Sequence, residues 1–197
     1  MTTLLLIRHG MTDAVGRRLT GRMPGIYLNE QGKREVEALA VRLEKTPLAA
    51  IYASPLERTQ ETARAIAAER QLDIISREGL VESDFGDWSG RLLADLAVDI
   101  GWKRFNDNRS STPAPGGEHM TEIQARMGRE LLRIRDAHPD QTVAVVSHAD
   151  PLRAALCLFL GISVDLLGRL EISTASVTTL RLTPDSVSLQ RLNDTGA

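Results

Sequence analysis

The chain has 197 residues, of which 42% are apolar and 25% are charged, and this length and composition suit a single domain over residues 1–197 with its own hydrophobic core. The formal charge of −2 at pH 7 excludes a broad basic field, so we expect neither nucleic acid nor an anionic membrane as a partner. The single cysteine, Cys157, excludes an internal disulfide framework and lies in an apolar run typical of a packed thiol.

The first apolar run covers only residues 4–7. It is too short for a signal peptide, and no later segment has the length of a membrane span, so the sequence predicts a cytoplasmic protein. The same run is typical of a strand buried on both faces. Asn29 then predicts the start of a helix, whose apolar side chains recur at helical spacing at Val36, Leu39, Ala40 and Leu43.

A second strand is predicted over residues 48–53. The segment Ser54-Pro55-Leu56-Glu57 behind it matches a capping box with proline in the first helical position, which predicts a helix that begins there and continues through Ala67. A weaker strand over residues 72–75 and a loop over residues 79–90 follow. Residues 91–117 give the least signal, and we expect a short helix there before a loop rich in proline and glycine.

The last third of the chain is again regular. Apolar residues step by threes and fours from Met120 to Ile134 and predict a long helix that ends before Pro139. Residues 142–147 form the clearest strand pattern, Asp150-Pro151 predicts a new helix start, and residues 177–192 resemble an edge hairpin. This alternation predicts an α/β fold, a three-layer α/β/α sandwich with a mainly parallel central sheet and an antiparallel edge.

Arginine and histidine side chains follow three of the predicted strands. Arg8 and His9 end the first strand, Arg58 lies in the helical turn after the second, and His148 follows residues 142–147. Parallel strands bring these positions to one carboxyl edge, where open α/β proteins bind ligands. Clustered cations repel one another unless an anion joins them, and guanidinium groups and helix N-termini bind phosphate well. The sequence therefore predicts a phosphate pocket.

The segment Leu-Leu-Leu-Ile-Arg-His-Gly, residues 4–10, resembles the signature of the histidine phosphatase superfamily, the phosphoglycerate mutase-like proteins. Further segments resemble the remaining motifs of that family in the same order along the chain: residues 18–21, 54–63, 82–90 and 147–149. The resemblance implies a phosphoglycerate mutase-like fold and an enzyme that moves a phosphoryl group through a phosphohistidine.

The resemblance also implies roles for individual residues. His9 would be the nucleophile, with a backbone carbonyl as the expected partner of its second nitrogen. Arg8, Arg58 and His148 would bind the phosphoryl oxygens. Glu82 would act as general acid and then as base, with its pKa raised by burial beside apolar groups such as Phe85 and Trp88. The expected substrate-binding residues are Arg8, Thr20, Gly21, Arg58, Glu82, His148 and Ala149.

The sequence departs from the family pattern at several points. Asp13-Ala14-Val15-Gly16 stands where relatives often have a phosphate-binding asparagine, Met11 replaces an acidic or amide residue, and Ala149-Asp150 stands where two glycines are common. Asp150 is an alternative acid to Glu82, although we expect it to cap a helix. His119 is expected at a helix start near the mouth of the pocket.

The resemblance leads us to expect a phosphomonoesterase that acts on a small phosphate ester. We expect it to need no metal or cofactor, because the histidines and carboxylates show no metal-ligand spacing. The sequence also has no P-loop. The alternative is a phosphoglycerate mutase, although mutases are usually longer. A third hypothesis is a binding protein without turnover. Candidate substrates are phosphoglycerates, sugar phosphates, nucleoside monophosphates and a ribazole phosphate. An exposed sheet edge would permit a homodimer.

Overall fold

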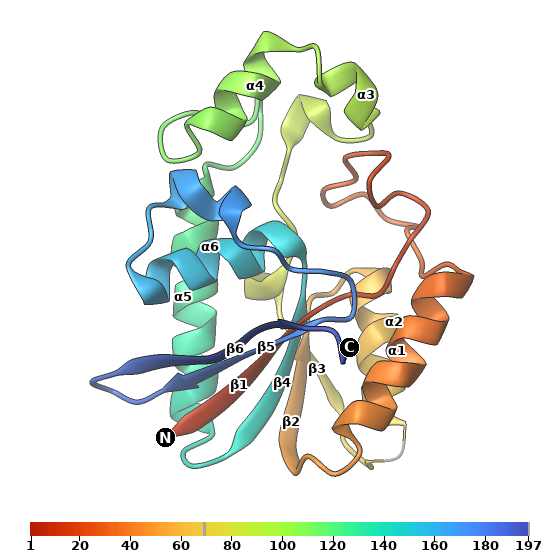
Figure 1. Cartoon of the computed structure of the whole chain (residues 1–197), viewed down its shortest axis with the longest axis vertical. Helices are drawn as coiled ribbons and strands as arrows, with labels where there is room; N and C mark the ends of the chain where they lie inside the picture. Colours follow the sequence, from red (N-terminus) through yellow and green to blue (C-terminus); the bar gives the residue numbers. More distant parts are fainter. Residues whose placement is uncertain (69, 197) are drawn as a thin grey trace.

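In the computed structural model, residues 1–68 and 70–196 are described, and this part of the chain forms a six-stranded sheet in the order β3-β2-β4-β1-β5-β6 (Figure 1). The strands are β1 (Thr2–Arg8), β2 (Leu48–Ala53), β3 (Ile74–Ser76), β4 (Thr142–Ser147), β5 (Val177–Leu182) and β6 (Val187–Asp194). The first four strands run parallel, whereas β5 runs antiparallel to β1 and β6 antiparallel to β5. The predicted mainly parallel sheet with an antiparallel edge is confirmed.

Helices cover both faces of this sheet (Figure 1). The α-helices are α1 (Glu30–Leu43), α2 (Glu57–Ala67), α3 (Leu93–Leu96), α4 (Ile100–Asp107), α5 (Met120–Ala137) and α6 (Ala149–Leu160). Short 3-10 helices are η1 (Glu78–Leu80), η2 (Gly86–Trp88) and η3 (Val164–Arg169). The predicted three-layer arrangement is confirmed, with α1 and α2 on one face and α5 and α6 on the other. Among the described residues, no helix combines the length and the apolar character that crossing a membrane requires.

Strand β1 explains why the N-terminal run is continuously apolar. Leu4 and Leu6 point into the core under α5 and α6, while Leu5 and Ile7 point into the core under α1 and α2. Successive side chains of a strand face opposite sides, so a strand covered on both faces needs apolar residues at every position. Directly after β1, His9 N donates to Ser147 O of β4 at 3.1 Å. This bond brings the ends of β1 and β4 together.

Two helix starts differ from the predictions. Helix α2 begins at Glu57 after Leu56, which has no side-chain capping bond, so the predicted capping box at Ser54 and the first-turn position of Pro55 are wrong. The Ser54 hydroxyl is bound instead to His148, because His148 Nε2 lies 2.8 Å from Ser54 Oγ. Asn29, by contrast, caps α1 as predicted and accepts from Gly32 N at 2.9 Å.

Helix α6 begins two positions earlier than the predicted cap at Asp150 implies. Its N-cap is His148, which makes no side-chain capping bond, and Asp150 lies inside the first turn. The expectation that Asp150 caps this helix is therefore wrong. Its carboxylate is drawn to two arginines, Arg109 and Arg153, rather than to the N–H groups of its own helix.

Residues 91–117 form a cap beyond the carboxyl ends of the parallel strands (Figure 1). This part holds two short helices, α3 and α4, where one was predicted. Asp99 caps α4 by accepting from Gly101 N at 2.8 Å and Trp102 N at 3.2 Å. Trp102 and Phe105 stack with ring centroids 5.6 Å apart, and Phe105 is almost fully buried. The cap is therefore held by aromatic packing above the sheet edge that carries Arg8 and His9.

Candidate active site

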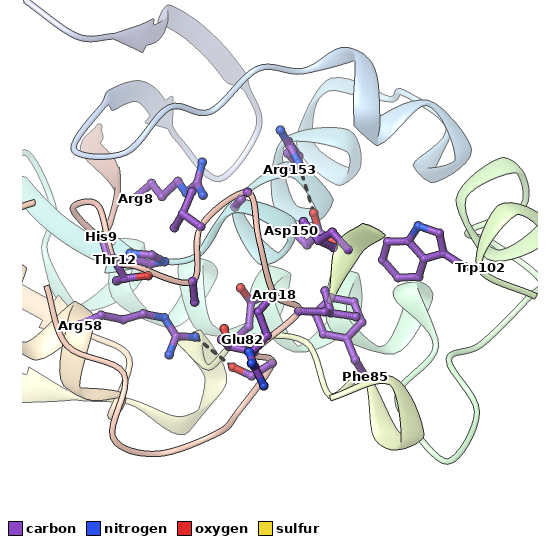
Figure 2. Close-up of a pocket in the computed structure, with 18 of the residues that line it drawn as sticks. Arg8, His9, Thr12, Arg18, Arg58, Glu82, Phe85, Trp102, Asp150 and Arg153 are labelled. Atoms are coloured by element: carbon purple, nitrogen blue, oxygen red, sulfur yellow. Dashed lines mark hydrogen bonds and ion pairs between the residues drawn. The ribbon is translucent and has the colours of Figure 1, made fainter. Parts of the chain in front are cut away.

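A cavity of about 280 Å³ lies at the carboxyl edge of the sheet, beneath the cap (Figure 2). Most of the residues predicted for the site line this cavity: Arg8, His9, Thr20, Gly21, Arg58, Glu82 and Ala149. His148 is fully buried behind the wall, with its ring centroid 5.3 Å from that of His9. The structure thus brings together all the residues that the sequence analysis selected for phosphoryl transfer.

His9 is placed as a neutral imidazole. Its side chain is buried, and Nδ1 lies 2.7 Å from the carbonyl oxygen of Gly10. A carbonyl only accepts, so Nδ1 carries the proton and Nε2 keeps a free electron pair. Burial first, and then the charges of Arg58 and Arg8, hold the pKa of His9 well below its usual range. The expected backbone partner is therefore present, and Nε2 has the state that a nucleophile needs.

Three buried nitrogen atoms around His9 have no hydrogen-bond partner among the described residues: Arg8 Nε, Arg58 Nη1 and His148 Nδ1. Each of these side chains is anchored through another nitrogen. Arg8 Nη1 donates to Ile172 O at 2.7 Å, Arg58 Nη2 donates to Gly21 O at 2.9 Å, and His148 Nε2 lies 2.8 Å from Ser54 Oγ.

Each unpaired buried donor destabilises the folded protein by about 1–3 kcal/mol. An oxyanion beside His9 would satisfy all three, because a phosphoryl group offers several strong acceptors. The anchored ends hold the free ends in place before any ligand enters. The geometry therefore suits an oxyanion beside His9.

Glu82 lies next to these donors and has the properties of a general acid. Its side chain is only 13% exposed, and its Oε2 lies 3.8 Å from His148 Nδ1. Burial first, and then the negative charge of Asp150, raises the pKa of Glu82. The Glu82 backbone carbonyl is fixed by Arg22 Nε at 2.9 Å and Arg126 Nη2 at 3.1 Å. Glu82 can therefore keep a proton near the cavity.

The apolar surroundings predicted for Glu82 are present in part. Phe85 lines the cavity together with Glu82. Trp88 is buried behind this wall and packs against Phe105, with ring centroids 5.3 Å apart. His119 is the N-cap of α5 as expected, but it does not line the cavity. Two arginines of the loop after β1 differ in their contacts: Arg18 lines the cavity, whereas Arg22 pairs with Glu118 at 2.6 Å.

Asp150 is unsuited to the role of proton donor. Arg109 Nη1 lies 3.0 Å from its Oδ2, and Arg153 Nη1 lies 3.3 Å from its Oδ1. Burial alone would raise the pKa of Asp150, but these two guanidinium groups hold it below its usual value. The carboxylate is therefore ionised, and the structure favours Glu82 over Asp150 as the acid.

The sequence analysis missed five lining residues: Thr12, Leu93, Trp102, Arg109 and Arg153. Thr12 is buried two positions after Gly10, so its nearness to His9 was a usable signal. Trp102 and Arg109 belong to the cap, where no periodic pattern indicated which side faces the sheet. Arg153 follows Asp150 by three positions on α6, so helical spacing could have indicated the pair.

Several known proteins are similar to this chain over almost its whole length. The sequence profile of the histidine phosphatase superfamily (branch 1) matches residues 4–195. A bifunctional protein of Mycobacterium tuberculosis is 39% identical over 201 residues, which cover 99% of this chain and 54% of that protein, so the chain spans about half the length of this curated relative. Phosphoserine phosphatase 1 of Hydrogenobacter thermophilus is 31% identical over 200 residues, covering 99% of this chain and 93% of that protein.

Two more relatives bear on fold and activity. A 2,3-bisphosphoglycerate-dependent phosphoglycerate mutase of Brucella melitensis is 33% identical over 199 residues, covering 93% of this chain and 94% of that protein. The solved structure of Bacillus stearothermophilus YhfR superposes with a TM-score of 0.92 and 30% identity, covering 98% of each chain. The resemblance found in the motifs is thus confirmed over almost the whole sequence. The chain belongs to the histidine phosphatase superfamily.

Proposed function

We propose that this protein hydrolyses phosphate monoesters of small molecules through a phosphohistidine at His9. The observation that carries the proposal is the placement of a neutral imidazole among three anchored donors with free ends, on Arg8, Arg58 and His148. In phosphoryl transfer the charge spreads over the equatorial oxygens of a loose transition state, and preorganised donors at those oxygens lower the barrier. We also propose that residues 1–197 form one catalytic domain.

The reaction proceeds in two balanced steps. His9 Nε2 attacks phosphorus while the bond to the leaving oxygen breaks, and Glu82 transfers its proton to that oxygen. The alcohol then leaves. Glu82, now a carboxylate, takes a proton from a water molecule, whose oxygen attacks phosphorus as the phosphorus–nitrogen bond breaks. Inorganic phosphate is released, and His9 and Glu82 regain their starting states.

A mutase would use the same first step and return the phosphoryl group to another oxygen of the substrate. The Brucella relative named as a mutase makes this the second candidate. The Hydrogenobacter relative named as a phosphatase covers more of this chain, 99% against 93%, which favours hydrolysis. A binding protein without turnover is the third reading of the pocket.

One experiment separates these candidates. The purified protein is incubated with O-phosphoserine, 3-phosphoglycerate and sugar phosphates, and free phosphate is followed. A parallel sample with 3-phosphoglycerate and a trace of 2,3-bisphosphoglycerate is analysed for 2-phosphoglycerate. His9→Ala is expected to abolish phosphate release. His119→Asn, which keeps a capping side chain on α5 away from the cavity, is expected to retain it.

Release of phosphate that depends on His9 supports hydrolysis. Formation of 2-phosphoglycerate without free phosphate would make the protein a mutase. An inert protein that still binds orthovanadate would be a binding protein, and unchanged turnover in His9→Ala would refute the phosphohistidine.

Two further expectations concern the setting of the enzyme. The cytoplasmic location stays a prediction, which cell fractionation tests. The homodimer also stays a prediction. Strand β6 forms one edge of the sheet and carries mostly exposed side chains, so an edge is present for pairing. Light scattering of the purified protein tests whether two copies associate.

A further inference from the structure

The end of the cavity farthest from His9 holds charged residues that the proposed reaction does not use. Figure 2 shows Arg8, His9 and Arg58 at one end, and Asp150, Arg153 and Trp102 toward the other. The side chains of Asp150 and Arg109 are 15% and 10% exposed, and they pair at 3.0 Å. A largely buried ion pair contributes little to stability, because desolvation offsets its attraction. Its position on the cavity wall therefore points to recognition of the leaving group.

Asp150 can accept hydrogen bonds without repelling a phosphate. Arg109 binds one of its carboxylate oxygens and Arg153 binds the other, so two positive charges offset the negative one. Each carboxylate oxygen has a further lone pair for a second donor. Because Asp150 only accepts, its partner on a leaving group must be a hydroxyl or an amine. Arg153 also donates through Nε to Leu170 O at 2.7 Å, so this guanidinium is held in place beside Asp150.

Apolar side chains also line this cavity: Trp102, Leu19 and Leu93. Figure 2 shows Trp102 at the same end of the cavity as Asp150. The Trp102 indole is held by Phe105, whose ring lies 5.6 Å away at an interplanar angle of 29°. The next contact in this series is the Arg109 guanidinium, 4.1 Å from the centroid of Phe105. Asn106 Oδ1 also accepts from Arg109 Nη2 at 2.6 Å. Trp102 and the partner of Asp150 are thus fixed by the same helix.

The combination of a hydrogen-bond acceptor and an indole wall matches one kind of leaving group. Sugar rings carry hydroxyl donors on their edge and an apolar C–H face that packs on aromatic side chains. A short acyclic acid has a donor for Asp150 but no ring face for Trp102. The cavity of about 280 Å³ lies near the lower end of the range of about 300–1,000 Å³ for ligand pockets, which suits a monosaccharide-sized group.

We propose that this end of the cavity binds the ring-form sugar of the substrate, with a ring hydroxyl donating to Asp150 and the ring face packed on Trp102. The inference rests on the proposed phosphatase function. Free sugar phosphates and nucleoside 5′-monophosphates share this ring, and both belong to the substrate class. Phosphates of short acyclic alcohols and acids are the poorer substrates.

The test compares kcat/KM for ribose 5-phosphate and adenosine 5′-monophosphate with kcat/KM for glycerol 3-phosphate and O-phosphoserine. We expect at least a tenfold preference for the ring substrates, which corresponds to about 1.4 kcal/mol. Trp102→Ala and Asp150→Asn are expected to reduce the preference by about tenfold, whereas Trp102→Phe retains most of it. Tyr27→Ala is the matched control, because Tyr27 is 56% exposed and does not line this cavity. Adenosine 5′-monophosphate distinguishes nucleotides from free sugar phosphates. If its kcat/KM exceeds that of ribose 5-phosphate, nucleotides are the better substrates.

Equal kcat/KM for ring and acyclic esters would overturn the inference, and so would variants that reduce both classes equally, which is the result of a structural role. A second measurement does not need turnover. In His9→Ala, ribose 5-phosphate is expected to change the tryptophan fluorescence, and His9→Ala/Trp102→Phe is expected to lose this change; a change that persists refutes the contact. Failure of the proposed function looks different, because no ester would then release phosphate in a manner that depends on His9.

Discussion

The hydroxyl of Ser54 is expected to determine which nitrogen of His148 carries the proton. Both side chains are fully buried, and Ser54 Oγ lies 2.8 Å from His148 Nε2. Ser54 Oγ already accepts from Leu56 N at 3.4 Å, and among the described residues its own proton has no other acceptor than His148. The hydroxyl therefore donates to Nε2, and the proton of the neutral ring lies on Nδ1.

This tautomer gives the site a neutral donor. His148 Nδ1 is the nitrogen without a partner, 3.8 Å from Glu82 Oε2. Burial first, and then the charge of Arg58, hold the pKa of His148 well below its usual range, which favours the neutral ring. The opposite tautomer would direct a bare lone pair toward the phosphoryl oxygens. Ser54 is thus a positioning residue that acts through His148.

Ser54→Ala removes this control and leaves Nε2 buried without a partner. The lost hydrogen bond and the unpaired buried group together cost about 1–3 kcal/mol, so kcat/KM is expected to fall between about fivefold and about 150-fold. Ser147→Ala is the matched control. Ser147 is equally buried and next to His148, but its hydroxyl donates to Leu80 O at 2.7 Å. It is expected to lose stability while kcat/KM stays near that of the unaltered protein.

The assay combines steady-state kinetics with ¹⁵N NMR of the His148 ring, in which protonated and bare nitrogens have distinct shifts. We expect a protonated Nδ1 in the unaltered protein and a mixture of tautomers in Ser54→Ala. A proton on Nε2 before the substitution would refute the reasoning, and so would full kcat/KM in Ser54→Ala.

Four more predictions concern the site and the loops around it. Because the pKa of His9 is lowered and that of Glu82 is raised, kcat/KM should fall at low pH as His9 gains a proton and at high pH as Glu82 loses one, and Glu82→Gln assayed with p-nitrophenyl phosphate should lose the alkaline limb. Because its pKa is raised, Glu82 binds its proton more tightly in the folded state than in the unfolded state. The free energy of unfolding therefore falls as the pH rises from the unfolded pKa of Glu82 through the folded one. Glu82→Gln should accordingly raise Tm at pH 8 but not at pH 4. Arg58→Met should lower kcat/KM by about 10²–10³ and abolish the rise in Tm that orthovanadate gives, since Arg58 contributes a buried donor; an unchanged vanadate effect would contradict the phosphate site. Gly86→Ala should lower Tm by several degrees in thermal unfolding, because Gly86 has a φ of +49° and a Cβ there would meet Pro115 O at 2.1 Å; an unchanged Tm would show that the loop adjusts freely.

The sequence predicted those parts of the site that short-range patterns specify. Arg8, His9 and His148 follow apolar strands, and the rule that parallel strands end at one edge places them together without knowledge of the side chains between. Glu82 lies in a loop with other acidic residues, so the motif resemblance, rather than any local pattern, distinguished it. The pKa of Glu82 is raised by burial and by the charge of Asp150, and Asp150 lies far from Glu82 along the chain.

The remaining parts depend on contacts that the sequence does not encode locally. Ser54 satisfied the pattern of a helix cap, but a residue 94 positions away competes for its hydroxyl. Asp150 likewise matched a capping residue, and Arg109, 41 positions earlier, binds it instead. In the cap, Asp99 before Trp102 and Phe105 was a usable helix signal. Nothing in that signal indicated that the indole would face the cavity.

The buried donors of the site affect both the stability of the protein without a ligand and the proposed reaction. Unpaired donors on Arg8, Arg58 and His148 lower stability, and apolar side chains in their place would avoid that loss. Because each side chain is anchored at its other end, the free donors cannot turn to other protein acceptors. An anion that enters the cavity satisfies them. The charge on the phosphoryl oxygens changes most in the transition state. Donors fixed at those oxygens therefore stabilise the transition state more than they stabilise the bound substrate. In the proposed reaction, the same anchoring that costs stability in the empty site therefore lowers the barrier to phosphoryl transfer, rather than only tightening the binding of the substrate.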